Sequence, residues 1–129
     1  ASGNYIPELA LVAEENGQLM GHIMLTKTYI VSDSSRFEAL LLAPVSVVLE
    51  HRNTGVGSSL IKESFKRAQE MGYKAVLLVG DPLYYTRFGF KTASGFGIKH
   101  TQEIPDKNVM ACELVPNGLK GISGTADCC

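Results

Sequence analysis

Ten residues in the middle of the chain have the composition of an anion-binding turn. The segment HRNTGVGSSL, residues 51–60, places Gly55 and Gly57 directly before a helix-like stretch, with Arg52 just upstream. The first turn of a helix leaves N–H groups without intrahelical partners and carries about half a positive charge. Glycines let a phosphate approach that backbone closely, and an arginine adds a mobile charge. The alternative is a plain corner with a solvated arginine.

Two common phosphate-binding motifs do not fit this segment. A P-loop requires Gly-Lys-Ser/Thr, whereas Gly57 is followed by Ser58 and Ser59. A dinucleotide-binding turn requires a third glycine, and Leu60 occupies its place. Any phosphate at this turn is therefore held by a different arrangement.

An apolar run precedes the turn and predicts one buried strand. Residues 38–49 are largely apolar, which is typical of a strand covered on both faces. Pro44 cannot donate a ladder hydrogen bond, so we expect a bulge there or a strand that parts from its neighbour.

The segment after the turn predicts a helix and a second strand. Apolar residues recur at spacings of three and four through residues 60–71, which indicates an amphipathic helix that ends at Gly72. A short apolar strand follows at residues 75–79. Together with the preceding strand, residues 39–79 have the size of a βαβ unit with parallel strands.

The outer segments predict further strands around this unit. Residues 9–13 and 19–31 are rich in aliphatic and β-branched side chains, and Asn16-Gly17 between them is a strong hairpin signal. After Gly80-Asp81-Pro82 we expect a short helix at residues 83–88, then an antiparallel pair joined by a long loop. The pair comprises residues 90–93 and 109–115, and the tail at 122–129 continues no recognisable element.

Composition limits the classes of function. With 129 residues, 45% of them hydrophobic, the chain has the size of one domain, which we expect to span residues 1–129. A net charge of -1 gives no field that favours nucleic acid or an anionic membrane. The three cysteines show no zinc-binding spacing. We therefore expect a soluble, cytoplasmic protein without a metal, and without nucleic-acid or membrane partners.

Two motifs together point to a known family. Arg52-x-x-Gly55-x-Gly57 after a buried strand resembles the acyl-CoA-binding motif of the GCN5-related N-acetyltransferase (GNAT) family. The segment GDPLYYTRFGF, residues 80–90, resembles the family's strand end followed by a tyrosine and a closing Gly-Phe. The resemblance runs from about Leu9 to Val115, and the second motif is similar to that of small bacterial acetyltransferases.

The resemblance implies an α/β fold of the mixed α+β type, with a central mixed sheet whose parallel strands splay apart and helices on its sides. It implies acetyl-CoA as co-substrate and acetyl transfer to a primary amine. Residues 45–47 match the family's strand segment whose main chain pairs with the pantetheine arm of the cofactor. Residues 52–58 match the family's segment whose amides bind the pyrophosphate. The implied cofactor-binding residues are Val45, Ser46, Val47, Arg52, Asn53, Thr54, Gly55, Val56, Gly57 and Ser58.

The resemblance also implies catalytic residues. Tyr85 stands four residues before Gly89, where the family commonly places the tyrosine that protonates the departing thiolate. A phenol is neutral at pH 7 and can donate a proton. Tyr84 competes for this role, and packing beside the neighbouring phenylalanines is the structural alternative. Glu38 matches a region where some relatives hold a basic carboxylate, although a solvated charge is the simpler interpretation.

Other reactive residue types carry weaker signals. His22 and His51 fit structural or exposed positions, and His100 falls in a loop without any signal. Asp81, before a proline, fits a turn. Cys112 fits a small core residue and not a nucleophile, since the sequence places no partner histidine beside it.

The chain also departs from the family pattern. Relatives begin with another strand and one or two helices, whereas only eight residues precede the first strand expected here. A non-catalytic acyl-CoA sensor is therefore a rival interpretation, and an interaction domain with an empty helix start is a third. We expect the acceptor to be an amine-bearing small molecule or peptide, which the sequence does not specify further. A homodimer formed by added strand pairing is also compatible with the sequence.

Overall fold

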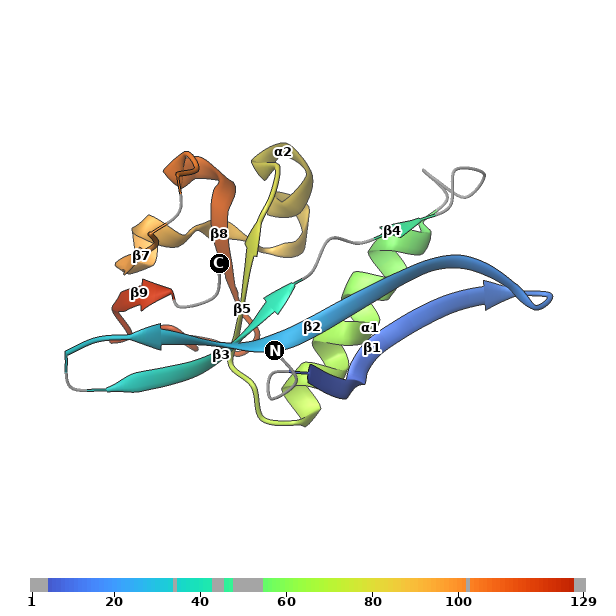
Figure 1. The fold of residues 1–129 in the computed structure, drawn as a ribbon, viewed down its shortest axis with the longest axis horizontal. Helices are drawn as coiled ribbons and strands as arrows, with labels where there is room; N and C mark the ends of the chain where they lie inside the picture. Colours follow the sequence, from blue (N-terminus) through green and yellow to red (C-terminus); the bar gives the residue numbers. More distant parts are fainter. Residues whose placement is uncertain (1–4, 34, 43–45, 48–54, 102, 127–129) are drawn as a thin grey trace.

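The chain folds into one mixed β-sheet with a long helix, α1 (Val56–Glu70), packed against it (Figure 1). The structure is a computed structural model that describes residues 5–33, 35–42, 46–47, 55–101 and 103–126. The strands of the sheet are β1 (Tyr5–Glu15), β2 (Gln18–Val31), β3 (Arg36–Leu42), β4 (Ser46–Val47), β5 (Ala75–Val79), β6 (Lys91–Thr92), β7 (Ile98–Lys99), β8 (Val109–Glu113) and β9 (Gly124–Ala126). Their order is β6-β8-β5-β3-β2-β9-β7, and β1 and β4 also pair with β2.

The predicted hairpin is confirmed as the antiparallel pair β1 and β2. Asn16 and Gly17 lie at its tip with φ values of 53° and 80°. Two consecutive positive φ values are what a tight primed turn requires, and asparagine and glycine adopt them at low cost.

Of the single strand expected over residues 38–49, the structure describes residues 38–42 and 46–47, which belong to β3 and β4; residues 43–45 and 48–49 lie outside the described residues. β3 pairs with β2 up to Leu42 opposite Leu25, and β4 resumes with Ser46 opposite His22. The chain thus advances by four residues while β2 advances by three, which is the register change of a β-bulge. Pro44, which motivated the expected bulge, lies outside the described residues.

The βαβ unit is confirmed, and its strands diverge. β3 and β5 pair in parallel at Leu40 with Val76 and at Leu41 with Leu77. Beyond this point β5 continues along β8, whereas β4 pairs, among the described residues, with β2 and not with β5 (Figure 1). The helix ends as predicted, because Gly72 follows it with φ 93°. The splayed strands implied by the sequence are therefore present at the carboxyl end of the unit.

Side chains alternate between two buried clusters on opposite faces of the sheet. Leu40, Val76 and Met110 belong to the cluster that includes the buried side of α1. Ala39, Leu77 and Ala111, their neighbours along the same strands, belong to the cluster that includes the loop after β6. The sheet is thus covered by α1 on one face and by irregular segments on the other.

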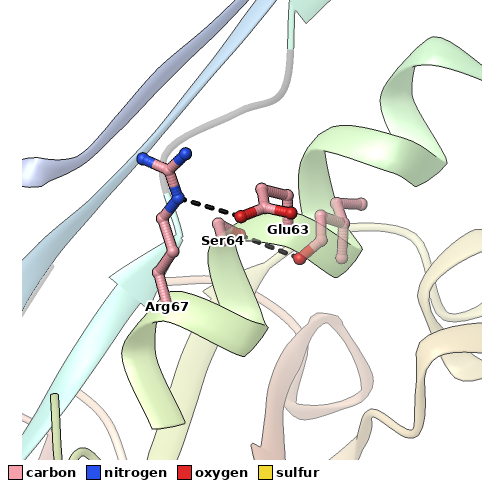
Figure 2. A network of polar contacts seen from close by, with 4 residues as sticks. Glu63, Ser64 and Arg67 are labelled. Atoms are coloured by element: carbon pink, nitrogen blue, oxygen red, sulfur yellow. Dashed lines mark hydrogen bonds and ion pairs between the residues drawn. The ribbon is translucent and has the colours of Figure 1, made fainter. Parts of the chain in front are cut away.

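The solvent side of α1 is stabilised by contacts within the helix. Arg67 Nε lies 2.9 Å from Glu63 Oε2, an i,i+4 pair, and both side chains are half exposed (Figure 2). Such exposed pairs contribute only about 0.3–0.5 kcal/mol. The buried Ser64 hydroxyl donates to the Ile61 carbonyl at 2.9 Å, which satisfies the one polar side chain on the core side of α1 (Figure 2).

The carboxyl-terminal third contains one confirmed and one incorrect expectation. β6 and β8 form the predicted antiparallel pair. The tail was expected to continue no element, yet β9 pairs antiparallel with β2 at Ile30 and Val31 and parallel with β7. Gly124 makes this pairing possible, because a Cβ there would lie 2.3 Å from the Val31 carbonyl oxygen. The terminal Cys128 and Cys129 lie outside the described residues.

Candidate active site

The start of α1 has the features of an anion-binding site. Gly55 is its N-cap with φ 90°, and its carbonyl accepts from Ser59 N–H at 2.9 Å. Among the described residues, no side chain caps this helix start, and its first turn contains no acidic residue. The N–H groups of Val56, Gly57 and Ser58 therefore keep their capacity to donate, at the positive end of the helix dipole. This donor set fits a phosphate-bearing ligand.

Only part of the predicted cofactor-binding set can be placed. Gly55, Val56, Gly57 and Ser58 form the first turn of α1. Ser46 and Val47 form β4, opposite His22 and Gly21 of β2. Four residues of the predicted set lie outside the described residues: Val45, Arg52, Asn53 and Thr54.

Tyr85 lies at the carboxyl end of β5, in a short helix that the sequence predicts. This helix, α2 (Pro82–Tyr85), begins one residue before the expected range of 83–88, and Asp81, expected in a turn, is its N-cap, because Asp81 Oδ1 accepts from Leu83 N–H at 2.9 Å. The ring of Tyr85 packs against the ring of buried Phe90, with centroids 5.9 Å apart. Burial raises the pKa of Tyr85 above 10.0, and the nearby Tyr84 adds to the shift. The phenol is therefore a neutral proton donor across the physiological range.

Tyr84, the competing tyrosine, is engaged differently. Its ring lies under the guanidinium of Arg87, whose carbon is 4.6 Å from the ring centroid. Arg87 Nε also donates to the Tyr84 carbonyl at 2.9 Å, which fixes the arginine over the ring. The Tyr84 and Tyr85 rings meet edge to face at 4.9 Å, so the two phenols share one aromatic cluster.

The turn that carries Tyr85 is held by close packing and two hydrogen bonds. A Cβ at Gly80 would lie 2.6 Å from Tyr85 Cε2, so only glycine permits the observed ring position. Gly80 N–H donates to the Asn108 carbonyl at 2.9 Å, and Asn108 Nδ2 donates to the Gly80 carbonyl at 3.0 Å. Sequence reasoning identified neither residue as a support for Tyr85.

Glu38 lies at the opposite end of the βαβ unit from Tyr85. It is an exposed residue of β3, opposite Tyr29 of β2. Its charge reaches Tyr73, which follows the carboxyl end of α1: burial raises the pKa of Tyr73, and the Glu38 carboxylate raises it further. The 15 residues of α1 span about 22 Å at about 1.5 Å per residue, and Gly55 stands at the other end. The structure brings Tyr85 and Gly55, but not Glu38, to one end of the sheet.

A cavity of about 390 Å³ lies beside α1 and carries three cations that sequence reasoning did not group. Lys62, Lys66 and Arg87 line it, and the single carboxylate there, from Glu113, accepts from Leu119 N–H at 3.0 Å. This charge balance favours anionic ligands near α1.

Cys112 also lines this cavity. Burial raises the pKa of its thiol to about 11, with a smaller contribution from Glu113. At neutral pH it is a neutral thiol, so the structure supports the predicted core role for Cys112 and not a nucleophilic one.

The loop after β7 contains a polar pair that the sequence did not indicate. His100 Nε2 lies 2.9 Å from Asp106 Oδ1, and the His100 side chain is 9% exposed. Within the described ranges, no three His, Cys, Asp or Glu side chains gather as metal ligands would. No helix in the part of the chain that the structure describes is long and apolar enough to cross a membrane.

Comparisons with known proteins agree with this geometry. Residues 4–93 match the family model described as an acetyltransferase (GNAT) domain. The chain is 33% identical over 89 residues to the uncharacterized N-acetyltransferase YjhQ of Escherichia coli (strain K12). This match covers 69% of this chain and 49% of YjhQ. It is 27% identical over 120 residues to the uncharacterized N-acetyltransferase YhbS of the same strain, covering 92% of this chain and 71% of YhbS.

Two solved structures of similar proteins contain CoA or acetyl-CoA. The GNAT family N-acetyltransferase YhbS from Escherichia coli, solved in complex with CoA, superposes with a TM-score of 0.88 at 25% identity, over 97% of this chain and 68% of that one. A GNAT family acetyltransferase from Brucella melitensis, solved with acetyl-CoA, superposes with a TM-score of 0.69 at 29% identity. The match covers 91% of this chain and 63% of the Brucella chain. The chain thus spans about half the length of YjhQ and about two thirds of these solved chains.

Proposed function

Because the chain belongs to the GNAT acetyltransferase family, we propose that it transfers an acetyl group from acetyl-CoA to a primary amine of a small molecule or peptide. The observation that carries this proposal is the start of α1, which no side chain of a described residue caps, together with the divergence of β4, which pairs with β2, from β5, which pairs with β8. A gap between splayed strands leaves backbone groups for an extended ligand arm, and the helix start binds its phosphates. The complexes of YhbS with CoA and of the Brucella enzyme with acetyl-CoA support this assignment.

On the donor side, we propose that the chain binds acetyl-CoA through two segments. The amides of Val56, Gly57 and Ser58 donate to the pyrophosphate, and Arg52 to Thr54 extend this contact. The main chain of Val45 to Val47 pairs with the pantetheine arm, and an amide there stabilises the developing oxyanion. Support for these roles comes from the family motif and from the open first turn of α1.

At the reaction centre, we propose that Tyr85 acts as general acid. Acetyl-CoA supplies a thioester, whose C–S bond breaks as the amine forms a C–N bond to its carbonyl carbon. The hydroxyl of Tyr85 donates its proton to the leaving sulfur, and the phenol is recharged by the proton that the amine loses. The raised pKa of Tyr85 supports this role, because the donor form is the one populated at neutral pH.

Glu38 is the residue that the sequence predicts as the base for the amine proton, acting directly or through water. Its position beside Tyr73, at the far end of α1 from Gly55, favours a role for Glu38 outside the reaction centre. The reaction proceeds without a dedicated carboxylate where the amine is already neutral, so the rate should rise with pH as free amine accumulates.

The experiment is acetyl transfer to a panel of amines by the full chain, with thiol release and the mass of the product as readouts. We expect stoichiometric release of CoA thiol and an acetylated amine that gains one acetyl group. A folded protein that binds acetyl-CoA but acetylates no member of a broad panel of alkylamines, polyamines, amino acids and peptides would favour the rival interpretation of an acyl-CoA sensor. A protein that binds no acetyl-CoA would exclude both.

A further inference from the structure

The cavity of about 390 Å³ beside α1 follows the same side of the helix as the proposed phosphate-binding turn. Residues four apart in a helix lie one above the other on one face. Lys62 and Lys66 line the cavity, and the residue one step before them in this row is Ser58. Gly57 stands in the same way one step before a second row of lining residues, which comprises Ile61, Phe65 and Gln69. The cavity thus continues along α1 from two residues whose amides are proposed to bind the pyrophosphate.

The spacing along α1 suits the nucleotide end of CoA. The helix rises about 1.5 Å per residue, so Lys62 stands about 7.5 Å and Lys66 about 13.5 Å along it from Gly57. Each lysine adds a flexible four-carbon stem, which lets its ammonium group reach back toward the turn. In CoA, the pyrophosphate is followed by a ribose that carries a 3′-phosphate and an adenine ring. A second phosphate therefore follows the first two at a distance of one sugar unit, within reach of these cations.

The cations of the cavity have donors to offer to a ligand. Among the described residues, neither Lys62, Lys66 nor Arg87 forms an ion pair with a carboxylate. Arg87 is held on one side, because its Nε donates to the Tyr84 carbonyl at 2.9 Å and its guanidinium lies over the Tyr84 ring. Its terminal N–H groups form a fork that matches a phosphate. The carboxylate of Glu113 leaves an excess of positive charge in the cavity, and a phosphate monoester carries about -1.5 to -2 charges at pH 7.

The aromatic wall of the cavity joins it to the reaction centre. Phe65 and Phe88 line the cavity and pack against the buried cluster to which Tyr85 also packs. The ring centroids of Phe65 and Tyr85 lie 5.7 Å and 5.9 Å from that of Phe90. The cavity is therefore on the same face of the sheet as the proposed general acid. Partly exposed aromatic rings offer stacking surface to a base, and the cavity volume falls within the range of about 300–1,000 Å³ that small-molecule sites occupy.

We propose that this cavity binds the 3′-phosphoadenosine end of acetyl-CoA. Lys62, Lys66 and Arg87 bind the 3′-phosphate, and the adenine packs against Phe65 and Phe88. This inference rests on the proposed transfer from acetyl-CoA. The start of α1 contacts only the pyrophosphate, which CoA and dephospho-CoA share, so the three cations distinguish the two. The protein therefore selects CoA thioesters over dephospho-CoA thioesters, and over carrier-protein thioesters of phosphopantetheine, which lack the nucleotide.

The test is calorimetric titration of acetyl-CoA and acetyl-dephospho-CoA, which differ only in the 3′-phosphate. Wild type should bind acetyl-CoA about 10- to 100-fold more tightly, the effect of a hydrogen bond between charged groups. This ratio should fall as salt is added, because exposed charges are screened. The triple variant Lys62→Gln, Lys66→Gln and Arg87→Gln should reduce the ratio to about one and keep the wild-type affinity for acetyl-dephospho-CoA.

A matched control separates the cavity from overall charge. It replaces three exposed lysines that do not line the cavity, so that net charge changes equally: Lys99→Gln, Lys107→Gln and Lys120→Gln. This control should keep the wild-type ratio. Loss of the ratio in both triple variants would overturn the inference, because overall charge would then account for the selection. Melting temperatures report whether each variant keeps the fold.

A competition experiment needs no acetyl transfer. Adenosine 3′,5′-bisphosphate should displace acetyl-CoA from wild type at a concentration about tenfold or more below that of adenosine 5′-phosphate, and this advantage should vanish in the triple cavity variant. Equal affinity of wild type for the two thioesters would overturn the inference and leave the donor site at the start of α1 in place. A folded wild type that binds neither thioester would overturn the proposed function as well.

Discussion

Replacing Tyr85 with Phe should lower kcat by about 100-fold or more, within the range of 10²–10⁴ that general acid catalysis contributes. The substitution removes the hydroxyl and keeps the ring that packs against Phe90 and over Gly80. The aromatic cluster and the fold should therefore survive. Steady-state thiol release with a saturating amine measures the effect, and calorimetric titration should show little change in acetyl-CoA affinity.

Tyr84→Phe is the matched control for this prediction. It removes the hydroxyl of the neighbouring tyrosine and keeps its ring. The cation–π contact with Arg87 therefore remains, because it needs only the ring. Its kcat should stay within about threefold of wild type, a small fraction of the effect of general acid catalysis. Loss of turnover in Tyr84→Phe, with Tyr85→Phe active, would reassign the acid to Tyr84.

The raised pKa of Tyr85 gives the same prediction a pH dependence. Burial makes the charged phenolate less favourable, so the proton donor persists as pH rises past 10.0. The stabilisation of the fold that comes from this pKa shift is fully present below the pKa that Tyr85 has in the unfolded chain. It is lost as pH rises through the pKa that Tyr85 has in the folded protein. The basic limb of kcat that belongs to Tyr85 should thus lie above pH 10.0 and be absent from Tyr85→Phe. A Tyr85-dependent limb near neutral pH would contradict the assignment.

Replacing Gly124 with Ala should destabilise the protein by about 3 kcal/mol, the upper part of the range for overpacked sites. A Cβ there would lie 2.3 Å from the Val31 carbonyl oxygen and 2.8 Å from its carbon. These are backbone atoms of β2, so they cannot rotate aside as a side chain would. Either β9 leaves the sheet or the end of β2 shifts, and either change lowers the free energy of unfolding. Urea or guanidinium titrations measure this decrease.

Gly121→Ala controls for backbone strain in this experiment. Gly121 also has a positive φ, 77°, but nothing lies within 4 Å of a Cβ placed there. Its substitution should cost about 1–2 kcal/mol, the strain of a left-handed alanine. Equal destabilisation by the two substitutions would mean that β9 does not pack against β2 as described.

The helix and the parallel unit were predictable because their signals are long and periodic. α1 repeats its apolar spacing over four turns, and Gly72 marks its end, so propensity and pattern agree. β9 is three residues long, too short to show a period of two, and its partners at Val31 and Lys99 are distant in sequence. Nothing local distinguishes such a strand from a disordered tail.

The candidate site divides in the same way. Gly55 and Tyr85 stand in motifs whose spacing is fixed by a helix start and a tight turn, so the sequence can propose them as site residues. The His100 and Asp106 pair spans a loop, and the burial of Nδ1 depends on contacts that no spacing encodes. Glu38 shows a third case, because its distance from Tyr85 follows from strand direction: it stands near the amino end of β3, whereas Tyr85 follows the carboxyl end of β5.

The central claim is that the start of α1 binds the phosphates of acetyl-CoA, and the most direct measurement is calorimetric titration of acetyl-CoA into wild type, Gly55→Ala and Gly72→Ala. The two glycines flank α1, have φ values of 90° and 93°, and have no described atom within 4 Å of a Cβ placed there, so both substitutions impose similar strain of about 1–2 kcal/mol. We predict that wild type binds, that Gly72→Ala binds equally well, and that Gly55→Ala binds about tenfold more weakly, because strain at the N-cap turns the donating amides away. A folded wild type that binds no acetyl-CoA, or equal affinities for the two variants, would contradict the account.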